Sequence, residues 1–171
     1  MRFARLTYAV ILSGTALWCA LIVLAPAAMS SRGSAPFAGI LYAFFSPLCH
    51  QIDARSYHLF GSPLAVCGRC SAVYFGFLSG TIAYPLRGGL LRSARPGRTF
   101  LLVALAPMLL DVMLEVTGLH ESSNALRGVT GAWFGVLLPF LIIPGAVEGI
   151  SQLFTQPNPH LIQPEKGLID A

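Results

Sequence analysis

The chain has 171 residues, of which 55% are hydrophobic and only 11% are charged, and its mean hydropathy is +0.70. A typical soluble domain is about a quarter charged, so this composition excludes an ordinary soluble protein and favours one domain embedded in a bilayer. The net charge of +4 comes from arginines between apolar segments. It therefore indicates membrane topology rather than a nucleic-acid-binding surface.

Four apolar segments are each close to the roughly 20 residues that a helix needs to cross a membrane. They are residues 6–29, 67–86, 99–119 and 128–147. A spanning segment must satisfy its own backbone hydrogen bonds, so we expect helices. The aromatic-rich stretch 36–48 is too short to cross. The sequence predicts an all-α integral membrane domain over residues 1–154, with four transmembrane helices plus a short interfacial or re-entrant helix, followed by a loose cytoplasmic tail over 155–171.

Arginines predict the orientation. Arg2 and Arg5 precede the first segment, and the loop between the second and third holds four more: Arg87, Arg92, Arg95 and Arg98. The positive-inside rule then places both termini in the cytoplasm of a multi-pass protein of the cell (inner) membrane. The first segment is longer than a signal-peptide core, so we expect a retained anchor, with cleavage as the alternative.

The third segment carries two acidic residues, Asp111 and Glu115, one turn apart near its outer end. An intramembrane carboxylate usually faces the protein interior or a water-filled cavity, and Arg127 is the expected counter-charge. Two interpretations stay open: a salt bridge that only fixes helix register, or a pocket in which Asp111 and Arg127 are catalytic. Polar residues expected to cap the fourth helix are Ser122, Ser123 and Asn124.

Small residues four apart predict close helix contacts. Gly76 and Gly80 form such a pair in the second segment, and Gly131 and Gly135 form another in the fourth. We expect these glycines to serve packing.

Three cysteines and a histidine in the outward part of the chain are the candidate metal ligands: Cys49, His50, Cys67 and Cys70. Three thiolates and an imidazole satisfy tetrahedral zinc. Because adjacent residues seldom both reach one ion, His58, Asp111 or water could replace one ligand. Redox thiols next to a helix N-terminus are a second interpretation, and a structural disulfide is a third. Cys19, in the first segment, is expected to be an inert packing residue.

Other residues near these thiols have possible roles. Tyr74 shares a helix face with Cys67 and Cys70, whereas Arg69 points elsewhere. Arg55 and Arg69 could bind an anion such as a phosphate or a lipid head group.

Several short motifs together resemble a bacterial membrane-protein family known as domain of unknown function 2085. They are Cys49-His50-Gln51, Arg55-Ser56, Gly61, Cys67-x-Arg69-Cys70, Tyr74-x-Gly76, Asp111, Ser123-Asn124, Arg127 and Thr130-Gly131. The resemblance covers roughly 36–145 and implies a small multi-helix membrane protein without an assigned activity. The chain departs from the pattern at Ala72 and Val112, where glycine is usual, and at Glu115, where glutamine is usual.

The sequence thus favours a membrane protein with a zinc site at its extracytoplasmic face, acting as a small enzyme on an anionic or lipid-like substrate. One alternative is a thiol-disulfide oxidoreductase coupled to quinone. Another is a structural subunit of a membrane complex, with a membrane-protein partner or a second copy of the chain. The expected partners include the lipid bilayer and exclude nucleic acid.

Overall fold

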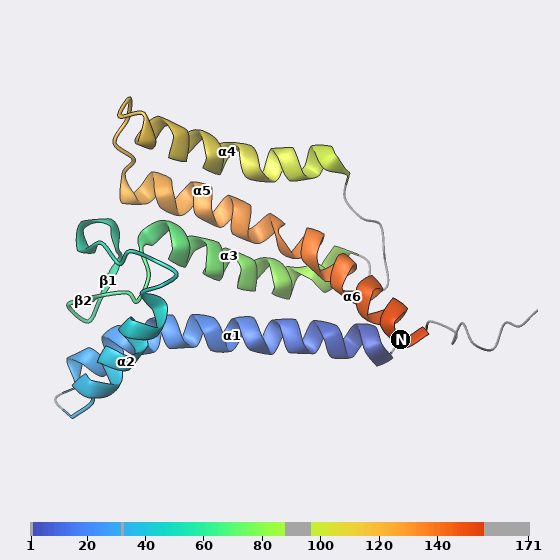
Figure 1. Ribbon diagram of the computed structural model, residues 1–171, viewed down its shortest axis with the longest axis horizontal. Helices are drawn as coiled ribbons and strands as arrows, with labels where there is room; N and C mark the ends of the chain where they lie inside the picture. The colour runs from blue at the N-terminus through green and yellow to red at the C-terminus, as the bar shows by residue number, and fades with distance from the viewer. Residues whose placement is uncertain (1, 32, 88–96, 156–171) are drawn as a thin grey trace, which may run out of the picture.

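The computed structural model describes residues 2–31, 33–87 and 97–155, and this part of the chain is mainly helical (Figure 1). In chain order its elements are α1 (Arg2–Ser30), α2 (Ala35–Phe45), the 3-10 turn η1 (Asp53–Arg55), β1 (His58–Leu59), β2 (Ser62–Pro63), α3 (Gly68–Ala83), the 3-10 turn η2 (Tyr84–Arg87), α4 (Arg98–Val116), α5 (Asn124–Leu137) and α6 (Pro139–Thr155). The predicted all-α class is confirmed, with one small antiparallel hairpin added. Apart from Thr155, the predicted tail lies outside the described residues.

Three described stretches are long and apolar enough to cross a membrane: Phe3–Ser30, Arg98–Val116 and Asn124–Ile150. They match the first, third and fourth predicted segments. The second predicted segment differs, because α3 has 16 residues and gives way to η2 at Tyr84. A helix of that length is shorter than the roughly 20 residues that span the hydrocarbon core. The short α2, with 11 residues, matches the predicted non-spanning helix.

The fourth predicted segment is divided between two helices that lie end to end (Figure 1). The N–H of Leu138 still donates to the carbonyl of Phe134 at 3.0 Å, and α6 then begins at Pro139. Proline has no backbone N–H to donate and favours the first position of a helix. The division therefore follows from the position of one proline.

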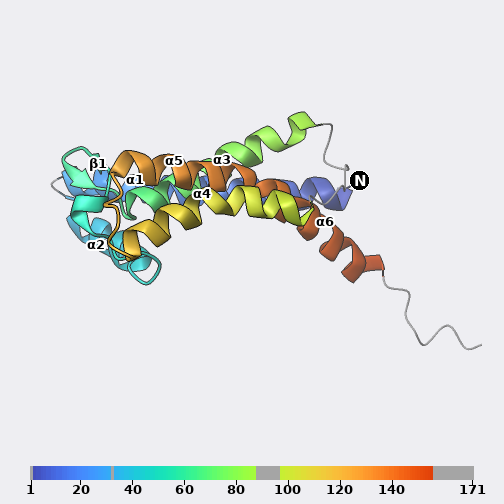
Figure 2. The same ribbon diagram turned by 90° about the horizontal axis from the view of Figure 1, so that it is seen from above.

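Helix α3 lies in the middle of the bundle, with α1 on one side and α5 on the other, and α4 packs on the far side of α5 (Figure 1). The α4–α5 turn, α2 and the β-hairpin lie together at one end, whereas the N-terminus lies at the opposite end (Figure 2). We call the first of these the hairpin end. It holds the thiols that the sequence singled out.

The α3–α5 contact is made by the predicted glycine pairs. A Cβ on Gly76 would lie 2.8 Å from the carbonyl oxygen of Ala132, and one on Gly131 would lie 2.7 Å from the carbonyl oxygen of Arg69. Real Cβ atoms do not come this close to backbone atoms, so the two helix backbones are in direct contact where these glycines lie. The prediction of glycine-mediated helix contact is confirmed, and the contact fixes the start of α3 against α5.

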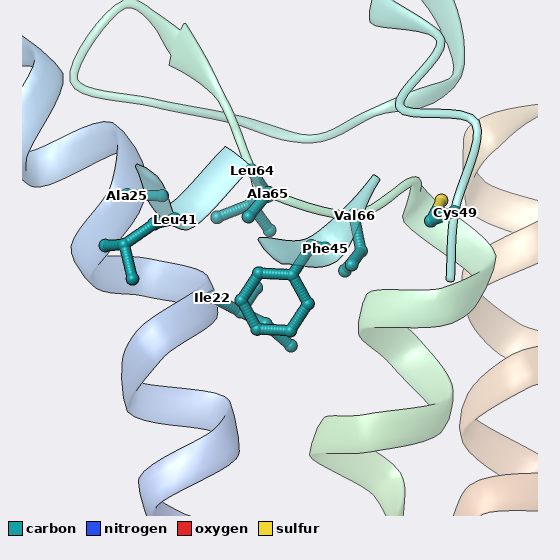
Figure 3. Close-up of a cluster of buried hydrophobic side chains, with 8 residues drawn as sticks. All are labelled: Ile22, Ala25, Leu41, Phe45, Cys49, Leu64, Ala65 and Val66. Atoms are coloured by element: carbon teal, nitrogen blue, oxygen red, sulfur yellow. The ribbon is translucent and has the colours of Figure 1, made fainter. Parts of the chain in front are cut away.

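A cluster of buried apolar side chains holds the loop between α2 and α3 onto the bundle (Figure 3). Its members are Ile22, Ala25, Leu41, Phe45, Cys49, Leu64, Ala65 and Val66. Within the same region the amide of Gln51 donates to the carbonyl oxygens of Tyr42 and Ala65, both at 2.8 Å. These contacts fix Cys49 beside the start of α3.

The outer faces of the long helices are apolar. Leu6 and Val10 of α1 and Leu102 and Leu110 of α4 are each more than 60% exposed. Water would penalise so many exposed leucine and valine side chains, whereas lipid chains are as apolar as they are. The protein is therefore in contact with the lipid bilayer along these faces.

Candidate metal centre

Three thiols from two parts of the chain meet at the hairpin end. The sulfur atoms of Cys49, Cys67 and Cys70 all lie within 4.8 Å of one another. Cys49 is buried, and the other two are half-buried. The N–H of Cys67 donates to the sulfur of Cys49 at 3.1 Å, which ties together the two parts of the site.

The start of α3 supplies two of the three thiols. Cys67 is the N-cap residue, in an extended conformation, and Cys70 follows in the first turn. Residues three apart on a helix lie on the same side, so both thiols face the loop that carries Cys49. A Cys-x-x-Cys pair at a helix N-terminus therefore needs only one approaching loop to become a three-thiol site.

Cys67 is poised as a thiolate. A hydrogen bond from the Cys70 thiol, against the opposing effect of burial, lowers the pKa of Cys67 to about 5, and the backbone N–H of Cys70 acts in the same direction. The thiolate is the form that binds metal and attacks electrophiles. At neutral pH this thiol needs no further deprotonation before it can act as a ligand.

The three thiols could hold a metal ion. Zinc–sulfur bonds are about 2.3 Å long, which places the sulfurs of a tetrahedral site about 3.8 Å apart. The three sulfurs lie within 4.8 Å of one another, so at most a movement of about 1 Å would bring them to that spacing. Three thiolates leave one of the four positions of tetrahedral zinc for another ligand.

The remaining predicted ligand, His50, lies outside the three-thiol group, although it lines the cavity that adjoins the three thiols. Its role as a fourth ligand stays a prediction. His58, a possible substitute, instead lies 3.0 Å from Asp53 on the exposed surface. The structure thus brings three of the four predicted ligands into one group.

A cavity of about 210 Å³ adjoins the thiols. Its lining residues are Leu48, Cys49, His50, Gln51, Ile52, Arg55, Cys67, Arg69, Cys70 and Arg127. Thiols and guanidinium groups therefore share one small space, which is a combination that helix packing alone does not require.

The three arginines converge on the two acidic residues of α4. Arg69 lies 2.5 Å from Asp111 and 2.9 Å from Glu115, and Arg127 lies 2.8 Å from Glu115. Arg55 lies 3.0 Å from the same Glu115 carboxylate. Arg127 is thus a counter-charge, as the sequence predicted.

Sequence reasoning missed the pairing of Arg69 with Asp111 and the central place of Glu115. The signal was present, because Arg69 at the mouth of the second segment and the acids near the outer end of the third had similar expected depths. Sequence alone did not show that α3 and α4 would both flank α5, which is what brings the two depths together.

Asp111 lies behind Arg69 rather than in the cavity. It is 4% exposed, and it accepts hydrogen bonds from the hydroxyls of Ser122 at 2.7 Å and Thr130 at 3.3 Å. It does not appear among the described residues that line the cavity. Its position suits orienting Arg69, and its catalytic role stays a prediction.

Helix α5 is tied to the hairpin end at its first turn. The hydroxyl of Ser123 accepts a hydrogen bond from the N–H of Leu126 at 3.2 Å, so its predicted capping role is confirmed. Asn124 instead uses its side chain to accept from Arg127 at 3.2 Å and to donate to the carbonyl of Ala54 at 3.3 Å. These bonds hold Arg127 and the loop around Arg55 in one assembly.

Two further predicted residues lie deeper. Tyr74 packs against Trp18 with ring centroids 5.8 Å apart, next to the apolar cluster. Cys19 is 3% exposed and donates to the carbonyl of Tyr74 at 3.5 Å, which agrees with its predicted packing role.

Comparison with known proteins agrees with the resemblance seen in the sequence. The family model described as "Predicted membrane protein (DUF2085)" matches residues 49–141, more than half of the chain. An uncharacterised protein of Methanocaldococcus jannaschii is 41% identical over 114 residues, which cover 67% of this chain and 73% of that protein. An uncharacterised protein of Methanothermobacter thermautotrophicus is 31% identical over 99 residues, covering 57% of this chain and 86% of that protein.

Both relatives are archaeal, so they support the membrane family but not its expected bacterial origin. No solved structure matches the chain. The matched region begins at Cys49 and includes every thiol of the site and all three arginines.

Proposed function

This chain belongs to the family of predicted membrane proteins DUF2085, and we propose that it uses Cys49, Cys67 and Cys70 to hold a zinc ion at the extracytoplasmic face. The observation that carries the proposal is that three thiols lie within 4.8 Å of one another. Cys49 joins this group although it is 18 residues before Cys67 in the chain. Thiolates favour zinc over the harder magnesium and calcium ions.

His50 would fill the fourth zinc position in a closed site, whereas a fourth position left open to the cavity would make the site catalytic. A bound zinc ion would act as a Lewis acid on a group of the substrate. A closed structural site would surround the metal with four protein ligands, whereas these thiols adjoin a cavity lined by Arg55, Arg69 and Arg127. We therefore favour a small membrane enzyme that acts on an anionic or lipid-like substrate, with Arg127 holding the substrate and Asp111 orienting Arg69.

The proposal includes four membrane crossings. Helix α3 and η2 together run from Gly68 to Arg87, which is about 20 residues and enough for a second crossing. At the hairpin end Arg55, Arg69 and Arg127 are paired with carboxylates, while four other described arginines lie at helix or turn ends on the opposite side: Arg2, Arg5, Arg87 and Arg98. This bias supports cytoplasmic termini. A membrane-impermeant thiol reagent should then reach metal-free Cys67 only from outside, and labelling from the cytoplasm would contradict the orientation.

The zinc proposal is tested by metal analysis of protein purified without added metal, together with a count of free thiols. We expect about one equivalent of zinc, with three of the four thiols protected from alkylation. Cys49→Ser should lose most of the metal, because two thiolates remain. Cys19→Ser is the matched control, since Cys19 is a buried cysteine outside the group, and it should keep the metal. Equal zinc in both variants would refute the assignment.

A second candidate function, thiol oxidation coupled to quinone, is favoured by a separate apolar cavity. This cavity, of about 390 Å³, opens between α1 and α3 and is lined by Trp18, Tyr74 and Phe77 among others. A flat lipid-soluble quinone is the kind of ligand that such walls accept. Absence of metal, with a Cys67–Cys70 disulfide in the purified protein, would favour this function over zinc binding.

A further inference from the structure

The arginine-lined cavity has unused hydrogen-bond donors. The ion pairs occupy Nη1 of Arg55, Nη2 of Arg69 and Nη2 of Arg127, and Nη1 of Arg127 donates to Asn124. The Nε of Arg69 is buried and has no hydrogen-bond partner. Leaving a buried charged donor unsatisfied is costly, so a partner that reached this atom would stabilise the site.

The arginine–carboxylate network carries a positive charge of its own. Three guanidinium groups share two carboxylates, so one positive charge is left over within the network. The side chain of Arg127 is only 9% exposed and that of Arg69 only 17%, so water screens this charge poorly. The Cys67 thiolate, or a zinc ion held by three thiolates, would contribute one negative charge beside it, so the site as a whole would be neutral and would not repel an incoming anion.

The size of the cavity limits what this anion can be. A volume of about 210 Å³ lies below the roughly 300 Å³ at which pockets begin to hold drug-sized ligands. The space suits a small ion or the head of a larger molecule whose remainder stays outside. Guanidinium groups pair with phosphate oxygens through parallel N–H donors, and three guanidiniums around one space match a tetrahedral oxyanion better than a flat carboxylate.

We infer that this cavity binds a phosphate-class oxyanion, held by Arg55, Arg69 and Arg127 beside the thiol centre. The inference rests on the proposed function for one point, which is that the anion lies beside a zinc ion and next to the fourth coordination position of that ion. The arginine pocket itself does not depend on the metal. The oxyanion could be free phosphate or the phosphate monoester head of a lipid, because both present the same chemistry to the arginines.

The test uses the full chain in detergent, with its zinc content measured first. Binding of inorganic phosphate is followed by calorimetry, and a second arm uses phosphatidylcholine vesicles with and without phosphatidic acid. Arg55→Gln is the informative variant, because Arg55 is 49% exposed and makes one ion pair, so the fold should survive its loss. Arg98→Gln, at the far end of the bundle at the start of α4, is the matched control.

We expect Arg55→Gln to weaken anion binding by at least about tenfold, as loss of a charge-assisted hydrogen bond does, while zinc content stays unchanged. Arg98→Gln should bind like the parent protein. Binding of free phosphate, or of phosphatidic acid vesicles alone, supports the inference and identifies the source of the oxyanion. No binding to a zinc-loaded protein, or equal binding by both variants, overturns it while leaving the zinc proposal intact. If the protein binds phosphate but cannot hold zinc, the zinc proposal is refuted, and so is the position of the anion beside a metal. The phosphate-binding role of the three arginines would still stand.

Discussion

Replacing Gly80 by alanine tests whether the direct contact of α3 with α5 stabilises the bundle. A Cβ at this position would overlap the carbonyl oxygen of Val136 and would lie 2.9 Å from its carbonyl carbon and 3.0 Å from its Cα. All three are backbone atoms of the neighbouring helix, which cannot rotate away as a side chain can. The two helices must separate instead.

The expected loss follows from two opposing effects. Overpacking costs about 1–3 kcal/mol, and we take about 3 kcal/mol because the obstruction is backbone. Alanine regains about 1 kcal/mol over glycine inside a helix. The net expectation for Gly80→Ala is a destabilisation of about 2 kcal/mol.

The control is Gly145→Ala in α6, where an added Cβ meets nothing within 4 Å. This variant should gain the helical preference without the clash, so it should be as stable as the parent protein or slightly more stable. Denaturant titration in detergent, followed by circular dichroism, measures both. If Gly80→Ala unfolds at the same denaturant concentration as Gly145→Ala, the inferred contact between the backbones of α3 and α5 is wrong.

Two further predictions concern the site. Asp111→Asn should destabilise the protein by about 3 kcal/mol, because it breaks a buried ion pair and leaves the charge of Arg69 poorly compensated, while the zinc content should not change. The same substitution at the exposed Asp53, which forms an ion pair with His58, should cost less than about 1 kcal/mol. Equal losses of stability in the two variants would contradict the argument from burial. The rate of alkylation of Cys67 in metal-free protein should be constant from about pH 8 to pH 6 and should fall only as the pH approaches the Cys67 pKa of about 5, because the thiolate is the reacting form. A thiol with the ordinary pKa of 9.0 would instead react about tenfold faster with each pH unit over this range, and that result would contradict the lowered pKa.

Much of the fold was predictable from the sequence for a direct physical reason. A helix that crosses lipid needs a long uncharged stretch, and such a stretch is visible in the chain without knowledge of its neighbours. The same holds for the capping role of Ser123 and for the glycine pairs, which depend on spacing along one helix. The end of α3 was less predictable, because the apolar stretch continues to residue 86 whereas the helix gives way to η2 at Tyr84, one residue before Pro85.

The ligand residues of the site were visible in the sequence, but their grouping was not. Any cysteine or histidine can be recognised as a possible metal ligand from its residue type alone, so all four were candidates: Cys49, His50, Cys67 and Cys70. Only the tertiary structure decided that Cys49 reaches the α3 pair while His50 lies outside the three-thiol group. Adjacent residues point in different directions, and which of them meets the pair depends on the path of the loop.

The sequence by itself determined a membrane protein with thiols, arginines and two intramembrane acids near one face, because hydrophobicity and side-chain chemistry are properties of single residues and short segments. The tertiary structure decided which of these groups meet. Packing of α3 and α4 on either side of α5 pairs Arg69 with Asp111 and gathers three arginines around Glu115. The contacts of Arg69 with Asp111 and Glu115 join residues more than 40 positions apart, where helix packing rather than local spacing sets the distance.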